Sequence, residues 1–197
     1  MKIALVGAGG FATDVKALMG QPDLLCFVDD EYFRPNDDCV LPLSKFDPKE
    51  YQLLITVSNP SARAKIVSRL PANTQYFTYI DSSALLMVKR GISLGKDCIV
   101  SAGCKLVDNI IIGDHCQLNL DTIVGHDVRI GNYFTSATRV IINGNSMIGN
   151  GVYFGTNACS KEKITVVDNV TVGLNSGVVS NLMEPGTYVG TPARKIK

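Results

Sequence analysis

The sequence has no tryptophan and only two histidines, and aromatic residues make up 7% of its 197 residues. Base-stacking platforms for nucleic acids are therefore not expected. The formal net charge is +1, so there is no electrostatic argument for a nucleic-acid or membrane-surface partner. The apolar stretches are far shorter than the roughly 20 residues of a membrane helix, and the N-terminus lacks the features of a signal peptide. We therefore predict a cytoplasmic protein.

The chain has six cysteines, but none of them forms a Cys-x-x-Cys pair. Because only two histidines could join them as ligands, we predict no structural zinc site. We interpret the cysteines as small buried residues in a reduced compartment. Hydrophobic residues reach 46% and charged residues 19%, which is enough apolar content to bury a core in one domain or two small ones.

Residues 1–80 alternate between strand-like and helix-like segments. Apolar runs at 3–6, 24–28 and 53–57 predict strands, and 75–80 predicts a last one. A helical pattern follows the first run, and Ala62 to Leu70 forms a second helix body, with Ser58 or Asn59 as its N-cap. This alternation predicts a small parallel sheet flanked by helices.

The first strand ends in a glycine-rich turn. Gly7-x-Gly9-x-x-Ala12 matches a variant of the dinucleotide-binding fingerprint, and Asp29-Asp30 follows about twenty residues on, as that fingerprint expects. Backbone amides and a helix N-terminus could hold a phosphate there. Because about 80 residues make only half of a doubly wound domain, a mononucleotide or nucleotide-sugar is favoured over NAD. A tight turn without a ligand remains the alternative.

A period of six residues runs through the chain after residue 80. Every sixth residue from Val88 to Val178 is large and apolar, except Ser136 and Ser160. The position two residues earlier, from Cys98 to Ser176, holds mostly small or β-branched residues. One bulky and one small inward residue in each group of six is typical of a hexapeptide β-helix, whose triangular coil takes about eighteen residues.

A finer period of eighteen supports this interpretation. The same pair recurs as Leu94-Gly95, Ile112-Gly113, Ile130-Gly131 and Ile148-Gly149. We expect each of these glycines to sit at a corner with unusual backbone angles. The register does not slip between residues 94 and 178, which predicts about five coils stacked at strand spacing. We therefore divide the chain into an α/β domain (1–80) and a β-helical domain with a C-terminal tail (81–197).

A packed shaft has no interior pocket, so its chemistry must lie on the outside. His126 lies outside the inward rows and is followed by Asp127, and a carboxylate beside an imidazole suits a general base. Its stacked neighbours would be Asp108 below, as a second candidate to orient the ring, and Gly144 above, as open space for a substrate. An exposed corner histidine without a role remains the alternative.

The second histidine, His115, also lies outside the inward rows. Asp97, Tyr133 and Asn150 fall within one residue of its column, so it lacks an open neighbour. We expect His115 to be solvated or interfacial, and not a core histidine. A metal site made from both histidines of one chain is disfavoured, because they fall on different faces.

Several motifs together resemble one known family. They are Gly7-Ala8-Gly9-Gly10, Val28-Asp29-Asp30, Val57-Ser58-Asn59, the hexapeptide shaft, Asn119 before His126-Asp127, and Val189-Gly190-Thr191-Pro192-Ala193-Arg194. The order is similar to that of the hexapeptide-repeat sugar O-acyltransferase family of the sialic acid O-acetyltransferase type, which includes bacterial nucleotide-amino-sugar N-acetyltransferases. The resemblance covers nearly the whole chain. It implies an α/β Rossmann-like subdomain, an all-β left-handed parallel β-helix, and a homotrimer with active sites between neighbouring shafts.

The resemblance also implies roles for single residues. His126 would be the base for direct transfer from acetyl-CoA, and Asp127 would orient it. The nucleotide-sugar would contact Gly9, Gly10, Phe11, Asp29, Asp30 and Asn59, with Asn119 beside the acceptor. The acyl-CoA groove would be lined by Gly144, Gly155, Thr156, Gly173 and Leu174. No metal is implied.

Two positions depart from the family pattern. Many relatives have histidine where this chain has Phe11, which bears on the identity of the sugar-nucleotide. Some amino-sugar enzymes carry a second active-site histidine where this chain has Thr135. These departures leave the proposed base unchanged.

We therefore predict an acetyl-CoA-dependent enzyme that N-acetylates a nucleotide-linked amino sugar for a surface polysaccharide or glycan. Acetyl transfer to a hydroxyl of a sugar such as sialic acid is the alternative reaction. A non-catalytic trimeric nucleotide-sugar-binding protein is the alternative of another class. A γ-class carbonic anhydrase is excluded, because it needs three zinc-binding histidines and the chain has two.

Overall fold

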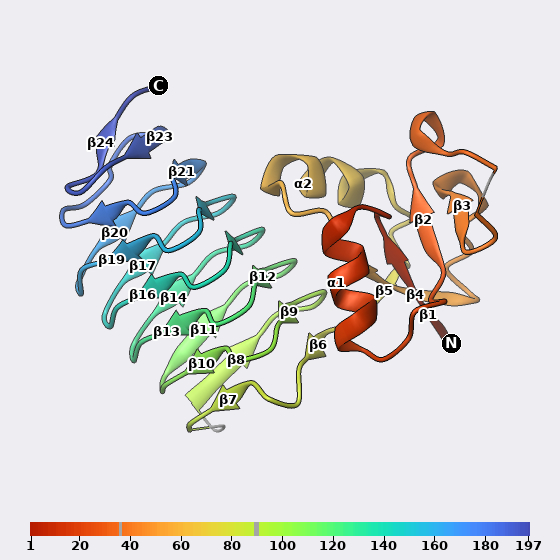
Figure 1. Ribbon diagram of the computed structural model, residues 1–197, viewed down its shortest axis with the longest axis horizontal. Helices are drawn as coiled ribbons and strands as arrows, with labels where there is room; N and C mark the ends of the chain where they lie inside the picture. Colours follow the sequence, from red (N-terminus) through yellow and green to blue (C-terminus); the bar gives the residue numbers. More distant parts are fainter. Residues whose placement is uncertain (36, 89–90) are drawn as a thin grey trace.

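The computed structural model describes residues 1–35, 37–88 and 91–197. Figure 1 shows two parts side by side: an N-terminal α/β part, coloured red to yellow, and a shaft of short strands, coloured green to blue. Helices α1 and α2 lie on the side of the α/β part that faces the shaft. The fold therefore places a nucleotide-type sheet beside a repetitive scaffold.

The N-terminal sheet has five parallel strands in the order β3-β2-β1-β4-β5. Its elements are β1 (Lys2–Val6), α1 (Gly10–Leu18), β2 (Cys26–Val28), the 3₁₀ turn η1 (Asp30–Tyr32), β3 (Val40–Pro42), the 3₁₀ turn η2 (Leu43–Lys45), β4 (Tyr51–Ile55), α2 (Pro60–Arg69) and β5 (Gln75–Tyr76). This order is the first part of the doubly wound arrangement, in which ligands bind beyond the carboxyl ends of the strands.

Helix α2 begins as the sequence predicts. The side chain of Asn59 accepts a hydrogen bond from the amide of Ala62 at 2.9 Å, and Pro60 follows it in the first turn. Proline fits there because its missing N–H has no intrahelical acceptor to lose. Helix α1 has no such side-chain cap, since Gly9 precedes it.

The two faces of the sheet bury different sets of residues. On one face, strand residues pack with Ile66 of α2; they are Ala4, Val6, Phe27, Leu53 and Ile55. On the other face, Leu5 and Leu54 pack with α1 and with Ile99, which belongs to the shaft. The second core therefore continues from the α/β part into the shaft.

The N-terminal elements differ from the prediction at two places. The run at 75–80 forms two strands, β5 in the N-terminal sheet and β6 (Tyr79–Ile80) in the shaft, because Tyr79 pairs with Ile99. Strand β3 was not predicted, since it has only three half-buried residues and no clear apolar alternation.

The shaft consists of three sheets. The docked sheet, which faces the α/β part, contains β6, β9 (Ile99–Val100), β12 (Gln117–Leu118), β15 (Thr135–Ser136), β18 (Tyr153–Phe154), β21 (Val170–Val172), β23 (Gly186–Val189) and β24 (Arg194–Lys195). The second sheet contains β7 (Leu85–Leu86), β10 (Lys105–Leu106), β13 (Ile123–Val124), β16 (Ile141–Ile142), β19 (Cys159–Ser160) and β22 (Gly177–Val178). The third sheet contains β8 (Ile92–Leu94), β11 (Ile110–Ile112), β14 (Arg129–Ile130), β17 (Met147–Ile148) and β20 (Thr165–Val166).

The predicted period of eighteen is confirmed by the strand pairing. Ile110 pairs with Ile92, Thr135 with Gln117, and Gly177 with Cys159, all in parallel. Both inward rows are buried from residue 98 to residue 178. The polar members of these rows satisfy each other or the backbone, as when the hydroxyls of Thr122 and Ser136 bond at 2.8 Å.

The beginning of the shaft corrects the predicted register. Lys105 pairs with Leu85, twenty residues earlier, so the first coil is two residues longer than the others. Leu86 therefore occupies the position below Leu106, and Val88, which was predicted to point inward, is 45% exposed.

The corners also differ from expectation. A residue with φ between 50° and 72° recurs every six positions from Asp97 to Asn175. The glycines after the core residues, such as Gly113, are not among these positive-φ residues, so the predicted unusual backbone angle is wrong. A Cβ on Gly113 would lie 2.8 Å from the carbonyl carbon of Gly131 in the next coil, so close stacking of coils requires the glycine.

Candidate active site

His126 lies at the corner between the second and third sheets, in a turn that begins after β13. Its Nδ1 is 2.7 Å from Oδ2 of Asp127. The side chains are 58% and 44% exposed, so the pair is open to a ligand. The hydrogen bond to His126, followed by one from Asn109, lowers the pKa of the Asp127 carboxyl. Asp127 is therefore an ionised acceptor for the ring.

A second layer of residues fixes Asp127. The side-chain amide of Asn109 donates to Oδ1 of Asp127, and Arg129 donates to the backbone carbonyl and side-chain oxygen of Asn109. Neither Asn109 nor Arg129 was predicted from the sequence. Asn109 could have been found, because it lies eighteen residues before Asp127 and therefore one coil below it.

Gly144 stacks on His126 as predicted, but it does not leave open space. A Cβ on Gly144 would lie 2.8 Å from Nε2 and 3.0 Å from Cε1 of His126, so the imidazole itself occupies the space above the glycine. The prediction that Asp108 orients the ring is also wrong. Its carboxylate accepts a hydrogen bond from the amide of Asn109 at 2.7 Å instead.

A cleft of about 730 Å³ opens at the carboxyl ends of β1, β2 and β4. Its lining comes from the glycine turn, the end of β2, the turn η1 and one side of α2; it includes Gly7, Ala8, Gly9, Val28, Asp29, Tyr32, Val57, Lys65, Ile66 and Arg69. Arg69 bonds to Asp29 at 2.7 Å across this cleft. The cleft thus combines apolar walls with two cations and a turn of backbone amides.

The predicted nucleotide-sugar positions divide between different places. Gly9 and Asp29 line the cleft. Asp30 turns away from it, because its carboxylate accepts the amide of Ser44, which lowers the pKa of that carboxyl. Phe11 packs against the core beneath α1, and Gly10 is the first residue of that helix. Asn59 caps α2 beside a different hollow, which Tyr153 also lines.

The predicted acyl-CoA positions lie at two corners of the shaft. Asn119, Gly155 and Gly173 lie in one column between the docked and second sheets, in which positions repeat every eighteen residues, with Thr156 and the 69% exposed Leu174 beside them. The side-chain oxygen of Asn119 accepts the amide of Leu120 at 2.7 Å. Gly144 lies at the other corner with His126. The second sheet therefore separates these two groups.

The structure does not bring the cleft and His126 together within one chain. The α/β part contacts the docked sheet, where Gln117 and Thr135 donate to the carbonyls of Ile55 and Ser58. His126 lies at the corner between the other two sheets, which in a three-sheeted shaft is opposite the docked sheet. A site that uses both must therefore be completed by a second chain.

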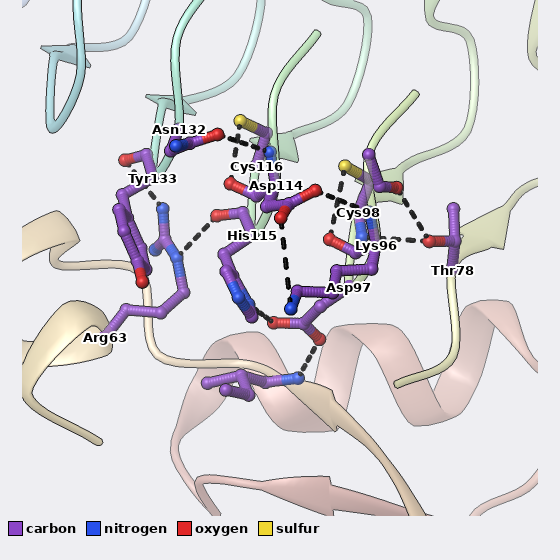
Figure 2. A network of polar contacts seen from close by, with 12 residues as sticks. Arg63, Thr78, Lys96, Asp97, Cys98, Asp114, His115, Cys116, Asn132 and Tyr133 are labelled. Atoms are coloured by element: carbon purple, nitrogen blue, oxygen red, sulfur yellow. Dashed lines mark hydrogen bonds and ion pairs between the residues drawn. The ribbon is translucent and has the colours of Figure 1, made fainter. Parts of the chain in front are cut away.

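His115 is not solvated, which corrects one of the two expectations for it. It is 2% exposed and lies between the shaft and the α/β part (Figure 2). Its ring stacks on Tyr133 with 5.1 Å between centroids, and Tyr76 meets it edge-on. Nδ1 of His115 is 2.8 Å from Oδ2 of Asp97, whose other oxygen accepts the amide of Ile55. His115 is thus interfacial within one chain.

Asp97 is completely buried in this junction, and burial raises the pKa of its carboxyl to about 6, although the hydrogen bond from His115 acts in the opposite direction. Thr135, at the position where some relatives carry histidine, is also in the junction. Its hydroxyl donates to the carbonyl of Ser58 and accepts from Arg63, both at 2.9 Å.

Neither a cluster of metal ligands nor a membrane-spanning helix occurs in residues 1–35, 37–88 and 91–197. These residues contain no group of three or more histidine, cysteine, aspartate or glutamate side chains that could hold a metal ion. In the same part of the chain, no helix is both long and apolar enough to cross a membrane. All six cysteines are free thiols. Four of them are buried as predicted, but Cys39 is half-buried and Cys159 is exposed at the surface of the shaft, so the prediction of burial is wrong for these two.

Comparison with known proteins gives a consistent picture. Residues 2–70 match the family model described as the PglD N-terminal domain. The UDP-3-O-acylglucosamine N-acyltransferase of Bordetella avium is 31% identical over 104 residues, which cover 51% of this chain and 29% of the relative. A probable mitochondrial UDP-3-O-acylglucosamine N-acyltransferase of Arabidopsis thaliana is 32% identical over 83 residues, 42% of this chain and 27% of the relative.

Solved structures resemble the whole chain. WeeI from Acinetobacter baumannii AYE superposes with a TM-score of 0.88 and 27% identity, and the match covers 100% of both chains. The acetyltransferase domain of PglB from Neisseria gonorrhoeae, in complex with acetyl coenzyme A, gives 0.85 with 23% identity over 99% of this chain and 98% of that one. PerB from Caulobacter crescentus, in complex with CoA and GDP-perosamine, gives 0.86 with 20% identity over 100% and 98%.

These comparisons confirm the predicted resemblance to hexapeptide-repeat sugar acyltransferases. The two structures below 25% identity support the fold alone. The chain spans less than a third of the length of the curated relatives named above. The activity, substrates and partners of this chain are therefore matters for proposal.

Proposed function

We propose that the chain is an acetyl-CoA-dependent acetyltransferase that N-acetylates a nucleotide-linked amino sugar, with His126 as the general base. The observation that carries this proposal is the exposed His126–Asp127 pair, whose imidazole lies over Gly144. Asp127 accepts from Nδ1, which leaves Nε2 free to take a proton from a substrate. PglB and PerB, which share this fold, were solved with acetyl coenzyme A and with CoA and GDP-perosamine, and these ligands match the proposed substrates.

The cleft of the α/β part is the proposed site for the nucleotide. Its glycine turn presents backbone amides, and Lys65 and Arg69 supply positive charge suited to phosphate groups. The apolar walls formed by Val57 and Ile66 provide surface for a base or sugar ring. In this assignment residues 1–80 bind the nucleotide-sugar and residues 81–197 carry the acyl transfer, with β6 crossing into the shaft.

The shaft is the proposed binding surface for acetyl-CoA. Leu174, beside the column that contains Gly155 and Gly173, offers exposed apolar surface for the pantetheine chain. We further propose that the coils wind left-handed and that three chains associate, so that His126 of one chain reaches the cleft of a neighbour. The separation of the two sites within one chain supports this assembly.

The chemistry that we propose is a direct transfer. The amine nitrogen of the sugar attacks the thioester carbonyl carbon, a C–N bond forms and the C–S bond breaks. Nε2 of His126 takes the proton that the amine loses, and the proton then passes to the departing CoA thiolate. Asp127 holds the ring through Nδ1 and stabilises the imidazolium while it carries that proton.

Thiol release from acetyl-CoA tests this proposal. The acceptors are UDP-, GDP- and dTDP-linked 3-amino and 4-amino sugars, with sialic acid as the hydroxyl acceptor and His126→Ala as the matched control. We expect release with an amino sugar that the variant loses while it stays folded. Release only with sialic acid would move the function to O-transfer. Release that survives in His126→Ala would remove the proposed base, and binding without release would favour a non-catalytic binding protein.

A further inference from the structure

Arg63 joins the α/β part to the shaft from inside the junction. It lies on α2, is 0% exposed, and makes six hydrogen bonds through its guanidinium. Figure 2 shows its contacts with His115 and Tyr133 of the shaft. Two go to the loop after β4, namely to the carbonyls of Val57 and Ser58. Four go to the shaft, namely to the carbonyls of His115, Tyr133 and Phe134 and to the hydroxyl of Thr135.

This arrangement is directional in a way that apolar packing is not. These six acceptors are neutral oxygens at 2.6 to 3.2 Å, two from the α/β part and four from the shaft. Burial lowers the pKa of the guanidinium to about 10, so it remains charged at neutral pH. Burying a cation costs free energy compared with burying an apolar side chain of similar size. The planar guanidinium, however, fixes both the distance and the angle between the two parts that it joins.

The groups that Arg63 fixes are walls of the proposed nucleotide-sugar cleft. The carbonyl of Val57 accepts from Arg63 and from Gln117 of the shaft, and Val57 itself lines the cleft. Helix α2 supplies Lys65, Ile66 and Arg69 to the same cleft within two turns of Arg63. On the shaft side, the acceptors belong to two successive coils: His115 lies in one coil and residues 133–135 lie in the next.

We infer that Arg63 is a positioning residue: it fixes the cleft relative to the shaft so that the bound sugar amine meets the acyl thioester and His126 of a neighbouring chain. This inference rests on the proposed function. Arg63 touches no reacting atom in this account, and it acts through Val57, α2 and the shaft corners. Its removal should therefore affect the rate of transfer more than the binding of either substrate.

The test compares Arg63→Met and Arg63→Lys with the wild-type chain and with Phe46→Leu. Phe46 packs on Phe27 at 5.6 Å between ring centroids, in a core that contains no shaft residue, so its variant loses stability without loosening the junction. The measurements are kcat, the KM for acetyl-CoA, and the Kd for the amino sugar that gives most thiol release in the panel above, taken by calorimetry.

We expect Arg63→Met to lower kcat by about 10- to 100-fold, because a displacement near 1 Å is enough for such a loss. Its Kd and KM should stay within about twofold, since the contacts of each substrate site are intact. Arg63→Lys should behave similarly, because a single ammonium cannot span both sets of acceptors. Phe46→Leu should keep its kcat. The inference is overturned if Arg63→Met keeps the wild-type kcat, if its Kd rises by as large a factor as its kcat falls, or if its kcat equals that of Phe46→Leu.

Two further measurements keep the inference testable if Arg63→Met does not fold or if no acceptor is found. Thr135→Val removes one shaft acceptor at nearly constant volume and should lower kcat by a smaller factor in the same pattern; an unchanged kcat would contradict the inference. If the wild-type chain transfers no acetyl group, the proposed function fails on its own. Hydrogen exchange then decides the inference: amides at 56–58 should exchange faster in Arg63→Lys than in the wild type, with 141–178 unchanged, and equal rates at 56–58 would overturn it.

Discussion

The imidazole of His126 lies directly on the backbone of Gly144, one coil away. The distance from Nε2 to the position of a Cβ on that glycine is 2.8 Å, which is shorter than real Cβ contacts. Gly144 has no positive φ, so its backbone would accept an alanine. The glycine is therefore needed for the position of the ring and not for the fold of the coil.

Gly144→Ala should lower the transfer rate while the chain remains folded. The added methyl group pushes the ring away from its place above the coil and weakens its alignment with a substrate proton. We expect a loss in kcat of about 10-fold or more, since general-base geometry is exacting, with an unchanged KM for the nucleotide-sugar. Steady-state kinetics and a thermal melt measure both. Full activity would show that the ring position is unimportant.

Asp127→Asn should reduce kcat without preventing binding. An asparagine can still reach Nδ1, but it can no longer stabilise a positively charged ring, so we expect a loss of about 10-fold or more. The hydrogen bonds from His126 and Asn109 lower the pKa of Asp127, so this carboxylate stays ionised through the neutral range. The acid limb of the wild-type pH–rate profile should therefore show a single ionisation. A second ionisation near that limb would contradict this reading.

Asp97 should make the stability of the junction depend on pH. Burial raises its pKa from 3.8 to about 6, so the folded chain holds this proton more tightly than the unfolded chain. The stabilisation from that proton is complete below about pH 4 and is lost as the pH rises through about 6. The unfolding free energy of the wild type minus that of Asp97→Asn should therefore decrease as the pH rises over that window. Urea titrations at several pH values measure it, and a constant difference would refute the assignment.

Lys65→Met should raise the KM for a nucleotide-sugar, because the cleft loses a cation near the expected phosphates. Hydrogen bonds to charged groups are worth about 1.5–3 kcal/mol, which corresponds to roughly 10- to 100-fold in KM. The value of kcat should change little. Lys161→Met is a matched control, since Lys161 is an exposed lysine of the shaft outside the cleft. Equal KM values for Lys65→Met and the wild type would move the nucleotide out of this cleft.

The repetitive part of the molecule was predictable because its signal is local and repeated. The inward rows, the coil length and the stacking of Gly144 on His126 all follow from counting in sixes and eighteens. The exceptions occur where the count changes: the first coil is longer by two residues, so Val88 is exposed and Leu86 takes its place.

The junction could not be predicted from the period. His115 occupies an outward position in every respect that the sequence reveals, and it is buried only because the α/β part covers that corner. Arg63 likewise appears as an ordinary charged residue of an amphipathic helix. Its burial depends on carbonyls contributed by residues 52 to 71 positions away.

The candidate site shows the same division. The His126–Asp127 pair was visible in the sequence, and Asn109 was one coil away and could have been inferred. The positions of Asp30 and Phe11 could not be inferred, because Asp30 bonds to the amide of Ser44 and Phe11 packs against the core under α1. The sequence shows neither contact. In the proposed assembly the cleft meets His126 of a second chain, which the periodicity of one chain does not reveal.

The measurement that tests the central claim most directly mixes two inactive variants. One carries His126→Ala, and the other carries Lys65→Glu with Arg69→Glu in the cleft; each alone should release no thiol from acetyl-CoA with the best amino-sugar acceptor. Co-expressed in equal amounts, they should regain about a quarter of the wild-type rate, because a mixed trimer keeps one site in three intact. A mixture that associates but stays inactive would contradict the claim that His126 of one chain serves the cleft of another.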